Sequence, residues 1–423
     1  MQGTDNTTPR SLALWTLLAC GTGMYFFANM QRVAIPGAIF SQLQAEFQAS
    51  ASAVTGLGSS FMYIYAFNQL IIGMLIDRYG GIRVILYGGL VFCLGSLVFP
   101  LSHSLPMLYI GRVLTGFGAS ALYLSLIKEI MRCFDRNYPI MVSIMILFGY
   151  AGGIAANAPF VAVAAEIGYR SVLLVMAMLS LVLYFGFAGA RLSLVLPAVK
   201  RDVALRLSNF AGVLKLRHNL CLFIFTGINW GLYYVIQTVL GKKFLEDFGG
   251  LAPMTAATVL SFLGLISASC GFLFAVLSRL LGNRRRIFCR LAGVVSIGSF
   301  GALTAMVFLD WRTPMLSVLF CLLSLTGSMS SIAIPLLRET NPEEQVGLAI
   351  SFMNFGFFLA VAFFGNLTGL LMDAFAPELV EGVLVYGRAS YLAVFAVLFF
   401  FSGLVFVCSL RMRETHGQKI TVT

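Results

Sequence analysis

The feature that most constrains this chain is a series of apolar segments, each long enough to cross a lipid bilayer. A hydrocarbon core of about 30 Å needs about 20 apolar residues in helical form. Only 11% of the residues are charged, against about 25% in soluble domains. The sequence therefore predicts an all-α membrane protein with twelve transmembrane helices, at 12–40, 52–76, 82–101, 106–131, 139–164, 171–195, 219–241, 253–277, 287–309, 313–337, 346–372 and 386–410.

Lysine and arginine are distributed unevenly between the two sides of these segments. If the N-terminus lies inside, the outer loops contain only Arg170, Lys242, Lys243, Arg312 and Arg388. Two more arginines, Arg32 and Arg112, fall within helices, and the remaining basic residues lie in inner loops and tails. This positive-inside bias predicts cytoplasmic N- and C-termini in a cell membrane, with a bacterial inner membrane favoured. The net charge of +11 is thus explained by topology, and no nucleic-acid partner is expected.

Several other classes of protein are disfavoured by what the sequence lacks. The eight cysteines are scattered, without a CxxC or a Cys/His cluster, so neither a metal site, a cofactor nor a disulfide framework is expected. No nucleophile–base spacing suggests an enzyme. A polar start, "MQGTDNTTPR", runs into a long apolar segment, which indicates a retained first helix rather than a cleaved signal peptide.

The chain divides into two halves around its longest inner connection. Residues 196–218 mix basic residues with leucine and valine, as in an amphipathic helix at the cytoplasmic interface. We expect one six-helix bundle at 1–195 and a second at 219–423, related by a pseudo-two-fold axis. An offset of 201 aligns "LIDRYGGIR" with "VLSRLLGNR", superposing Arg78 on Arg279 and Gly81 on Gly282.

The segment "GMLIDRYGGIRVIL" resembles the signature between helices 2 and 3 of the major facilitator superfamily. The residues that carry the match and would form a conformational latch are Gly73, Asp77, Arg78, Gly80 and Arg83. Gly73 would let two helices approach closely, and the Asp77 carboxylate would accept hydrogen bonds at a helix N-terminus and pair with basic residues. The family's usual basic pair is replaced by Gly81 and Ile82. The resemblance implies alternating access.

Two further segments extend the resemblance. "GRVLTGFG" (111–118) is similar to the family's helix 4 signature, and "NMQRVAIP" to helix 1 of the organic anion:cation symporter branch. That branch commonly has an acid at the position of Gln31 and often another at Ala119. Both acids are absent, which argues against proton symport by that mechanism. The glycine-rich "LFGYAGGIAANAP" lacks the GPxxGG arrangement of drug/proton antiporters.

A polar stripe in the first predicted helix is the leading candidate for substrate contact. Tyr25, Asn29 and Arg32 are spaced i, i+4, i+7, so they share one face. An arginine at a helix centre costs about 2.5–3.5 kcal/mol, so it normally faces protein or water. Arg112 should lie at comparable depth, so both arginines are candidates to face the cavity between the halves and to hold the substrate. The alternatives are that Arg112 pairs with backbone carbonyls of a neighbouring helix, and that Arg32 snorkels to the headgroups.

The second half offers a matching stripe. Asn229, Tyr233 and Gln237 share one face of 219–241, with Trp230 and Tyr234 beside it; ordinary packing near an interface is the alternative. Further candidates for the cavity are Gln31, Tyr65, Gln69, Tyr123, Asn157 and Asn354. The run "SLTGSMSS" (324–331) is expected to serve close helix packing rather than ligand binding.

These observations favour a monomeric secondary transporter in the lipid bilayer for a small organic solute. Arginine suits bidentate carboxylate recognition, so a carboxylate-bearing anion or zwitterion is expected. None of the 17 acidic residues falls in mid-helix, and Glu129 is the nearest. Uniport or exchange is therefore favoured over proton coupling. Two alternatives stay open: an exporter of apolar or cationic compounds, and a non-transporting receptor on the same fold.

Overall fold

The computed structural model describes residues 8–134, 137–194, 216–380 and 382–420. Within them, twelve helices are long and apolar enough to cross a membrane. The predicted all-helical membrane fold with twelve crossings is therefore confirmed. The predicted interfacial helix at 196–218 falls almost entirely outside the described residues, and its last two residues belong to the next transmembrane helix.

The described part of the first half contains six crossings and three shorter helical elements. Pro36 ends the first crossing early, because proline lacks an N–H and disfavours helix in the residue before it. The predicted helix at 12–40 therefore stops at Ala34, and a separate short helix follows. The elements are α1 (Thr8–Ala34), η1 (Gly37–Ile39), α2 (Phe40–Phe47), α3 (Ala51–Tyr79), α4 (Gly81–Leu101), α5 (Leu105–Cys133), α6 (Tyr138–Ala155), α7 (Ala158–Ile167) and α8 (Tyr169–Leu192).

The second half repeats this organisation and adds a two-stranded antiparallel hairpin before the last helix. Two of its crossings are interrupted. The elements are α10 (Arg217–Val235), the π-helical turn η2 (Ile236–Leu240), α11 (Gly241–Asp247), α12 (Pro253–Leu280), α13 (Arg286–Phe308), α14 (Met315–Leu323), η3 (Ser324–Thr326), α15 (Ser330–Thr340), α16 (Glu343–Asp373), β1 (Glu378–Val380), β2 (Val383–Val385) and α17 (Arg388–Leu410).

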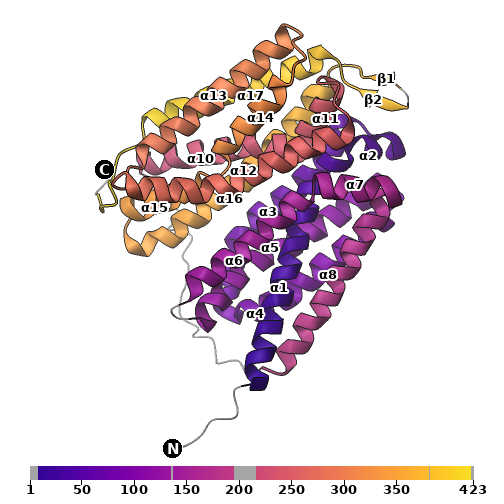
Figure 1. Ribbon diagram of the computed structural model, residues 1–423. Coiled ribbons are helices and arrows are strands. Elements are labelled where there is room, and N and C mark those ends of the chain that lie inside the picture. The colour runs from indigo at the N-terminus through magenta and orange to yellow at the C-terminus, as the bar shows by residue number, and fades with distance from the viewer. Residues whose placement is uncertain (1–7, 135–136, 195–215, 381, 421–423) are drawn as a thin grey trace, which may run out of the picture.

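The two halves form separate groups of helices that meet along two seams (Figure 1). One seam packs α3 against α16, and the other packs α6 and α7 against α12. The first seam thus joins the second crossing to the eleventh, and the second seam joins the fifth crossing to the eighth. A two-fold axis that exchanges the halves converts one pair into the other, which agrees with the predicted pseudo-symmetry. The boundaries of the halves at 195 and 219 stay a prediction.

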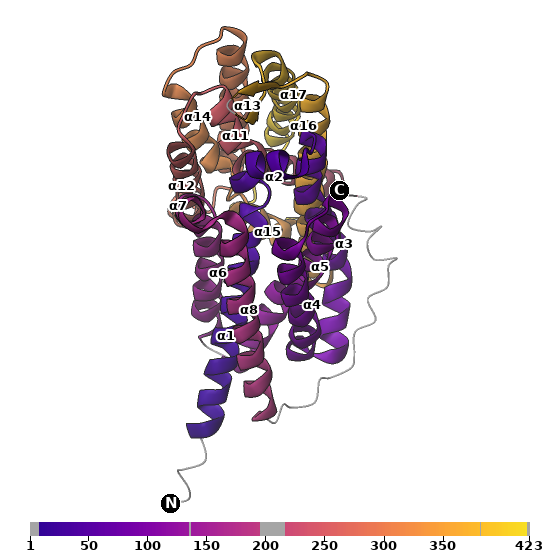
Figure 2. The ribbon, with the colours of Figure 1, turned by 90° about the vertical axis from the view of Figure 1, so that its right-hand side faces the viewer.

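The two ends of the molecule differ in how the halves meet. They converge near α2, α7 and α11, which we call the closed end, and separate toward the chain termini, which we call the open end (Figures 1 and 2). At the closed end Asp373 of α16 accepts hydrogen bonds from the backbone N–H groups of Ala51 (2.7 Å) and Ser52 (3.0 Å), and so caps α3 from the opposite half. Gln44 donates to the Tyr386 hydroxyl, again across the halves (2.9 Å).

Glycines in left-handed conformation mark the repeated turn at the open end. Gly80 (φ 84°) separates α3 from α4, and Gly282 (φ 72°) follows α12. This backbone conformation is open to glycine at little cost. The sequence offset of 201 pairs Gly282 with Gly81 instead, so the structural repeat is shifted by one residue at this point.

Candidate functional site

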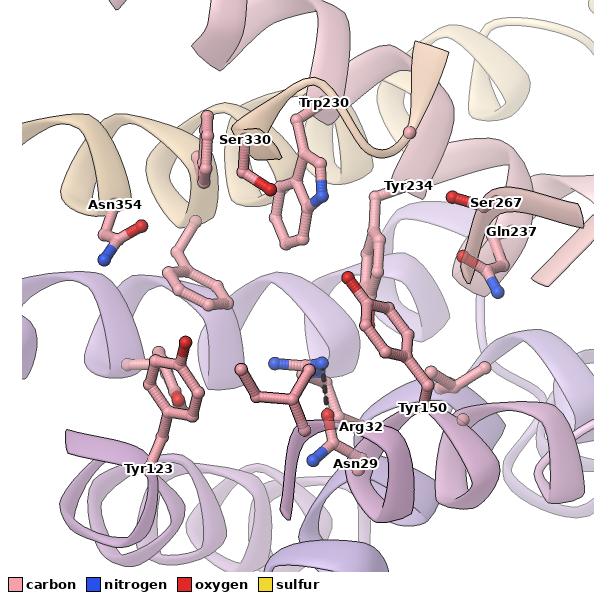
Figure 3. A pocket seen from close by; sticks show the side chains of 18 of the residues that line it. Asn29, Arg32, Tyr123, Tyr150, Trp230, Tyr234, Gln237, Ser267, Ser330 and Asn354 are labelled. Carbon is pink, nitrogen blue, oxygen red and sulfur yellow. Dashed lines mark hydrogen bonds between the residues drawn. The ribbon is translucent and has the colours of Figure 1, made fainter. Parts of the chain in front are cut away.

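A cavity of about 300 Å³ lies between the two halves. Its walls come from α1, α3, α5 and α6 on one side and from α10, α12, α15 and α16 on the other. Figure 3 shows the side chains of both halves facing each other across it. A site built from both halves is the arrangement that alternating access requires, since relative movement of the halves alters both its walls and its access.

One charged side chain lines this cavity among the residues that the structure describes, and it is Arg32. It lies in the last turn of α1 and is hydrogen-bonded to the side-chain oxygen of Asn29. Asn29 in turn donates to the Tyr25 carbonyl (2.8 Å), one helical turn earlier. The predicted stripe of Tyr25, Asn29 and Arg32 therefore faces the cavity as one unit. The expected alternative, that Arg32 snorkels to the headgroups, does not describe this position.

Aromatic rings enclose the Arg32 guanidinium from the opposite half. Its central carbon lies 5.5 Å from the ring centroid of Tyr234 and 5.8 Å from that of Phe358. Trp230 is stacked with Tyr234 at 4.4 Å and with Phe357 at 5.3 Å, and it also lines the cavity. The guanidinium is thus held by a ring quadrupole on one side and an amide on the other. Its five N–H donors exceed the single acceptor provided by Asn29.

Uncharged polar groups lie at both sides of Arg32 (Figure 3). Gln237 and Ser267 occupy one side, and Asn354 and Tyr123 the other. Gln237 sits in the π-helical turn η2, where one extra residue per turn changes the direction in which side chains project. Such turns occur frequently at functional sites.

The interruption between α14 and α15 also opens onto the cavity. Gly327 and Ser330, within the predicted packing run 324–331, line it. The neighbouring Ser328 makes the expected packing contact, since its hydroxyl donates to the Ser267 carbonyl at 2.5 Å. The run therefore serves both packing and the cavity wall. The fifth crossing is interrupted as well, because Pro159 near the start of α7 ends α6 before it.

The cavity gathers most of the residues that the sequence singled out. Those that line it are Tyr25, Asn29, Arg32, Tyr65, Gln69, Tyr123, Trp230, Tyr233, Tyr234, Gln237 and Asn354. Four candidates lie elsewhere. Each of them has at least one polar atom hydrogen-bonded within the protein.

Arg112 is buried inside the first half, with 1% of its surface exposed. Its guanidinium donates to the carbonyls of Leu57 (3.0 Å), Gln31 (3.4 Å) and Ile35 (3.2 Å), and it lies 4.5 Å from the centroid of the Phe61 ring. The Ile35 carbonyl follows the end of α1, where helical acceptors lack intrahelical donors. Arg112 therefore pairs with backbone carbonyls of neighbouring helices, which was the alternative to substrate contact. The carbonyls flanking Arg32 also confirm that both arginines lie at the same depth.

The other three residues have amide side chains, and each forms a hydrogen bond with another group of the protein. Gln31 accepts a hydrogen bond from the Ser96 hydroxyl (3.1 Å), which ties α1 to α4. Asn229 donates to the Thr326 carbonyl (3.0 Å) at the interruption of the tenth crossing. Asn157 donates to the Gly153 carbonyl (3.2 Å).

Some lining residues were not identified from the sequence. Tyr150, Ser267, Phe357 and Phe358 belong to this group. Tyr150 lies inside the glycine-rich run 147–159, which was a usable signal, since small neighbours leave space beside a large ring. Ser267 and the two phenylalanines lie in predominantly apolar helices, where a single serine or phenylalanine does not distinguish a cavity wall from a lipid-facing surface.

The predicted latch residues lie at the open end. Asp77 forms an ion pair with Lys128 of α5, and Arg78 stacks against the neighbouring Tyr79 ring at 5.3 Å. Glu129, rather than Asp77, meets the start of α4, where it accepts a hydrogen bond from the backbone N–H of Ile82 (3.3 Å). The expected close helix approach at Gly73 is wrong for this conformation, because a Cβ there would meet no atom within 4 Å.

Twelve crossings in two halves, with a cavity between them, define a polytopic membrane transporter. The profile of the Major Facilitator Superfamily matches residues 21–307, and the chain belongs to this family of secondary transporters, which is non-enzymatic. Its small-molecule substrate is not identified by this membership.

Solved structures agree with this assignment. The nucleoside transporter NupG has a TM-score of 0.69 at 13% identity, covering 95% of this chain and 100% of that one. An auto-inhibited POT family peptide transporter has a TM-score of 0.69 at 15% identity, covering 94% and 95%. At such low identity, the likeness shows the fold alone. No curated protein matches the chain.

Proposed function

We propose that this transporter moves a small carboxylate-bearing anion or zwitterion by alternating access, as a uniporter or exchanger. Its termini would lie in the cytoplasm, and the membrane would be a bacterial inner membrane. Arg32 would anchor the carboxylate, with Tyr25, Asn29, Tyr123, Tyr233, Gln237 and Asn354 around it. Asp77, Arg78, Gly80 and Arg83 would act in the latch at the open end.

The observation that carries this proposal is the state of Arg32. Among the described residues, Arg32 is the charged side chain that lines the cavity. Asn29 accepts a hydrogen bond from only one of the three guanidinium nitrogens. An arginine in a site shielded from water gains most from a bidentate partner, and a carboxylate supplies two oxygens in matching geometry. A substrate carboxylate would provide that partner and neutralise the site.

The rearrangement would exchange contacts between the two ends. Contacts such as those of Asp373 with the start of α3 would break as the closed end opens. The ion pairs of the open end, Asp77–Lys128 and Arg285–Glu339, each lie within one half. They would be free to rearrange as the halves approach each other there. Two arrangements of similar free energy are what a transport cycle requires.

Rival functions make different demands on the cavity. A cationic substrate would meet the positive charge of Arg32 without a carboxylate partner among the described lining residues. A receptor would bind a carboxylate without moving it. Counterflow in proteoliposomes distinguishes the receptor from a transporter, because only a transporter exchanges internal for external solute.

The proposal is tested by a thermal-shift screen of the purified protein, followed by counterflow with each hit. The panel contains carboxylates, amino acids and phosphates, together with a nucleoside and a dipeptide. We expect carboxylates to raise the unfolding temperature and the Arg32→Gln variant to lose that response while staying folded. Exchange that persists unchanged in Arg32→Gln would contradict the anchor role.

A matched control is Arg170, which lies in the first turn of α8 at the closed end. Arg170 is a partly exposed residue that pairs with Glu46 (2.6 Å) away from the cavity. Arg170→Gln should keep the thermal response to carboxylates. If both variants lose it equally, the response reflects general destabilisation rather than substrate contact.

A further inference from the structure

We infer that the substrate is a monoanion that carries its carboxylate on a flat, conjugated, otherwise uncharged body. This inference rests on the proposed carboxylate site and narrows it. It separates aromatic monocarboxylates from the amino acids and dicarboxylates that the broader proposal also admits. The inference is based on the charges and on the ring geometry of the cavity.

The charge balance of the cavity selects a single negative charge. Arg32 supplies one positive charge, and the described lining contains neither an aspartate nor a glutamate. A monoanion would neutralise the site. A dianion would bring a second carboxylate with no cation to pair with, and a zwitterion would bring an ammonium group with no anion. A charge without a partner is costly to transfer out of water.

Aromatic faces often substitute for an acid in binding an ammonium group, but the two rings nearest to Arg32 already face its guanidinium. Arg32 lies against the rings of Tyr234 and Phe358, within the distance at which a cation is attracted to a ring. An ammonium group placed against the same faces would approach a like charge. The rings beside the carboxylate site therefore do not compensate for an ammonium group held close to the carboxylate, as in an amino acid.

The remaining rings favour a flat body. Trp230 is nearly parallel to Tyr234, with 21° between the ring planes, and to Phe357, with 28°. Tyr25 and Tyr123 of the other half form a second pair at 5.6 Å. A further ring stacked in an offset or edge-to-face arrangement gains more than its buried area alone provides. A saturated body of the same size gains the burial without the stacking.

Size and distal polarity complete the description. The cavity volume of about 300 Å³ is at the small end of the range of ligand sites, about 300–1,000 Å³. It suits a body of one or two rings. Gln237 and Ser267, to one side of Arg32 in Figure 3, can donate to or accept from an uncharged polar substituent at the far end of such a molecule.

The experiment is isothermal titration of the purified full-length protein with matched probes. Benzoate and nicotinate are flat monoanions, and cyclohexanecarboxylate has the same charge on a puckered ring. Benzamide removes the charge, phenylalanine adds an ammonium group, terephthalate adds a second carboxylate, and benzylammonium reverses the sign. We expect a flat monoanion to bind tightest, with each probe of altered charge at least about tenfold weaker, a difference of about 1.4 kcal/mol.

Substitutions separate the ring preference from the charge preference. Trp230→Leu should equalise benzoate and cyclohexanecarboxylate yet keep the preference over benzamide, and Trp230→Phe should retain the ring preference. Trp311, an exposed residue outside the cavity, provides the control variant Trp311→Leu, which should change neither. Arg32→Gln should equalise benzoate and benzamide.

Each outcome decides between the narrow and the broad proposal. If phenylalanine or terephthalate binds as tightly as the flat monoanions through Arg32, the inference of a monoanion is overturned while the carboxylate site stands. If cyclohexanecarboxylate equals benzoate in the parent protein, the flat body is overturned. If no carboxylate of the panel gives Arg32-dependent binding, the proposed function itself fails.

Discussion

Arg32 and Arg112 are the same residue type at the same depth of the same half, yet their surroundings differ fundamentally. Arg112 donates to three backbone carbonyls of α1 and α3 and is 1% exposed. Arg32 donates to the Asn29 side chain, has no hydrogen-bond partner at its Nε and faces a cavity. A buried guanidinium with an acceptor at each of its three nitrogens holds neighbouring helices together, whereas one with an unpartnered nitrogen at a cavity can bind a ligand. Their hydrogen-bond partners, not their depth, distinguish their roles.

The largest effect should follow from removing Arg112. Arg112→Ala leaves three carbonyls without their donor inside the first half, which we expect to cost about 3 kcal/mol or more of stability. The midpoint of thermal unfolding of the purified protein should fall sharply. Arg112→Lys should recover only part of the loss, because an ammonium group does not reproduce the guanidinium fork. A folded Arg112→Ala protein that has lost only ligand binding would remove the distinction between the two arginines.

The next effect should be on binding rather than stability. Arg32→Gln should weaken a bound carboxylate by about 1.5–3 kcal/mol, the contribution of hydrogen bonds to a charged group. Its unfolding midpoint without ligand should stay close to that of the parent, since the buried framework of Arg112 is untouched. Titration calorimetry and thermal unfolding measured on the same sample check both parts. A large loss of stability in Arg32→Gln would instead make Arg32 structural.

A third variant separates contacts that persist in transport from those that must break. Arg112 bonds within one half, whereas Asp373 caps α3 from the other half. Asp373→Asn removes the charge and one of the two acceptor oxygens of that cap, which should cost about 1 kcal/mol and shift the population toward opening of the closed end. Distances between spin labels on α7 and α11, in a background without the native cysteines, should lengthen. Asp310→Asn, which affects only the local pair with Arg312, is the control and should leave them unchanged.

The smallest effect concerns a third arginine, at the surface of the closed end. Burial opposes ionisation of Glu46, but hydrogen bonds from Arg170 and Tyr169 outweigh it and hold the pKa of Glu46 below its ordinary value. The unfolded chain then binds more protons, so this stabilisation is present above the ordinary glutamate pKa of about 4.3 and is lost as the pH falls below it. Because the pair is partly exposed, it is worth about 0.5 kcal/mol or less.

Thermal unfolding between neutral pH and pH 3.5 measures this effect by comparing the parent with Glu46→Gln. The variant should be slightly less stable at neutral pH, and the difference should shrink on acidification. A difference that grows as the pH falls would have the wrong sign for a depressed pKa.

The crossings and much of the cavity lining were predictable from sequence, whereas the interruptions were only partly so. Pro36 and Pro159 signal where helices end. The π-helical turn at Ile236–Leu240 has no comparable signal, because isoleucine, threonine, valine and leucine there fit an ordinary apolar helix. That turn and the gap at Gly327 place Gln237 and Ser330 on the cavity. Their positions depend on packing between segments far apart in the chain.

The sequence by itself determined that the chain crosses a membrane twelve times and that Tyr25, Asn29 and Arg32 share one helix face. These properties follow from local hydrophobicity and from helical periodicity, which neighbouring residues alone define. Only the tertiary structure decided that Arg32 faces a cavity while Arg112 is enclosed by the carbonyls of Gln31, Leu57 and Ile35. The number of acceptors that surround a guanidinium depends on which helices pack against it, and that information is not local.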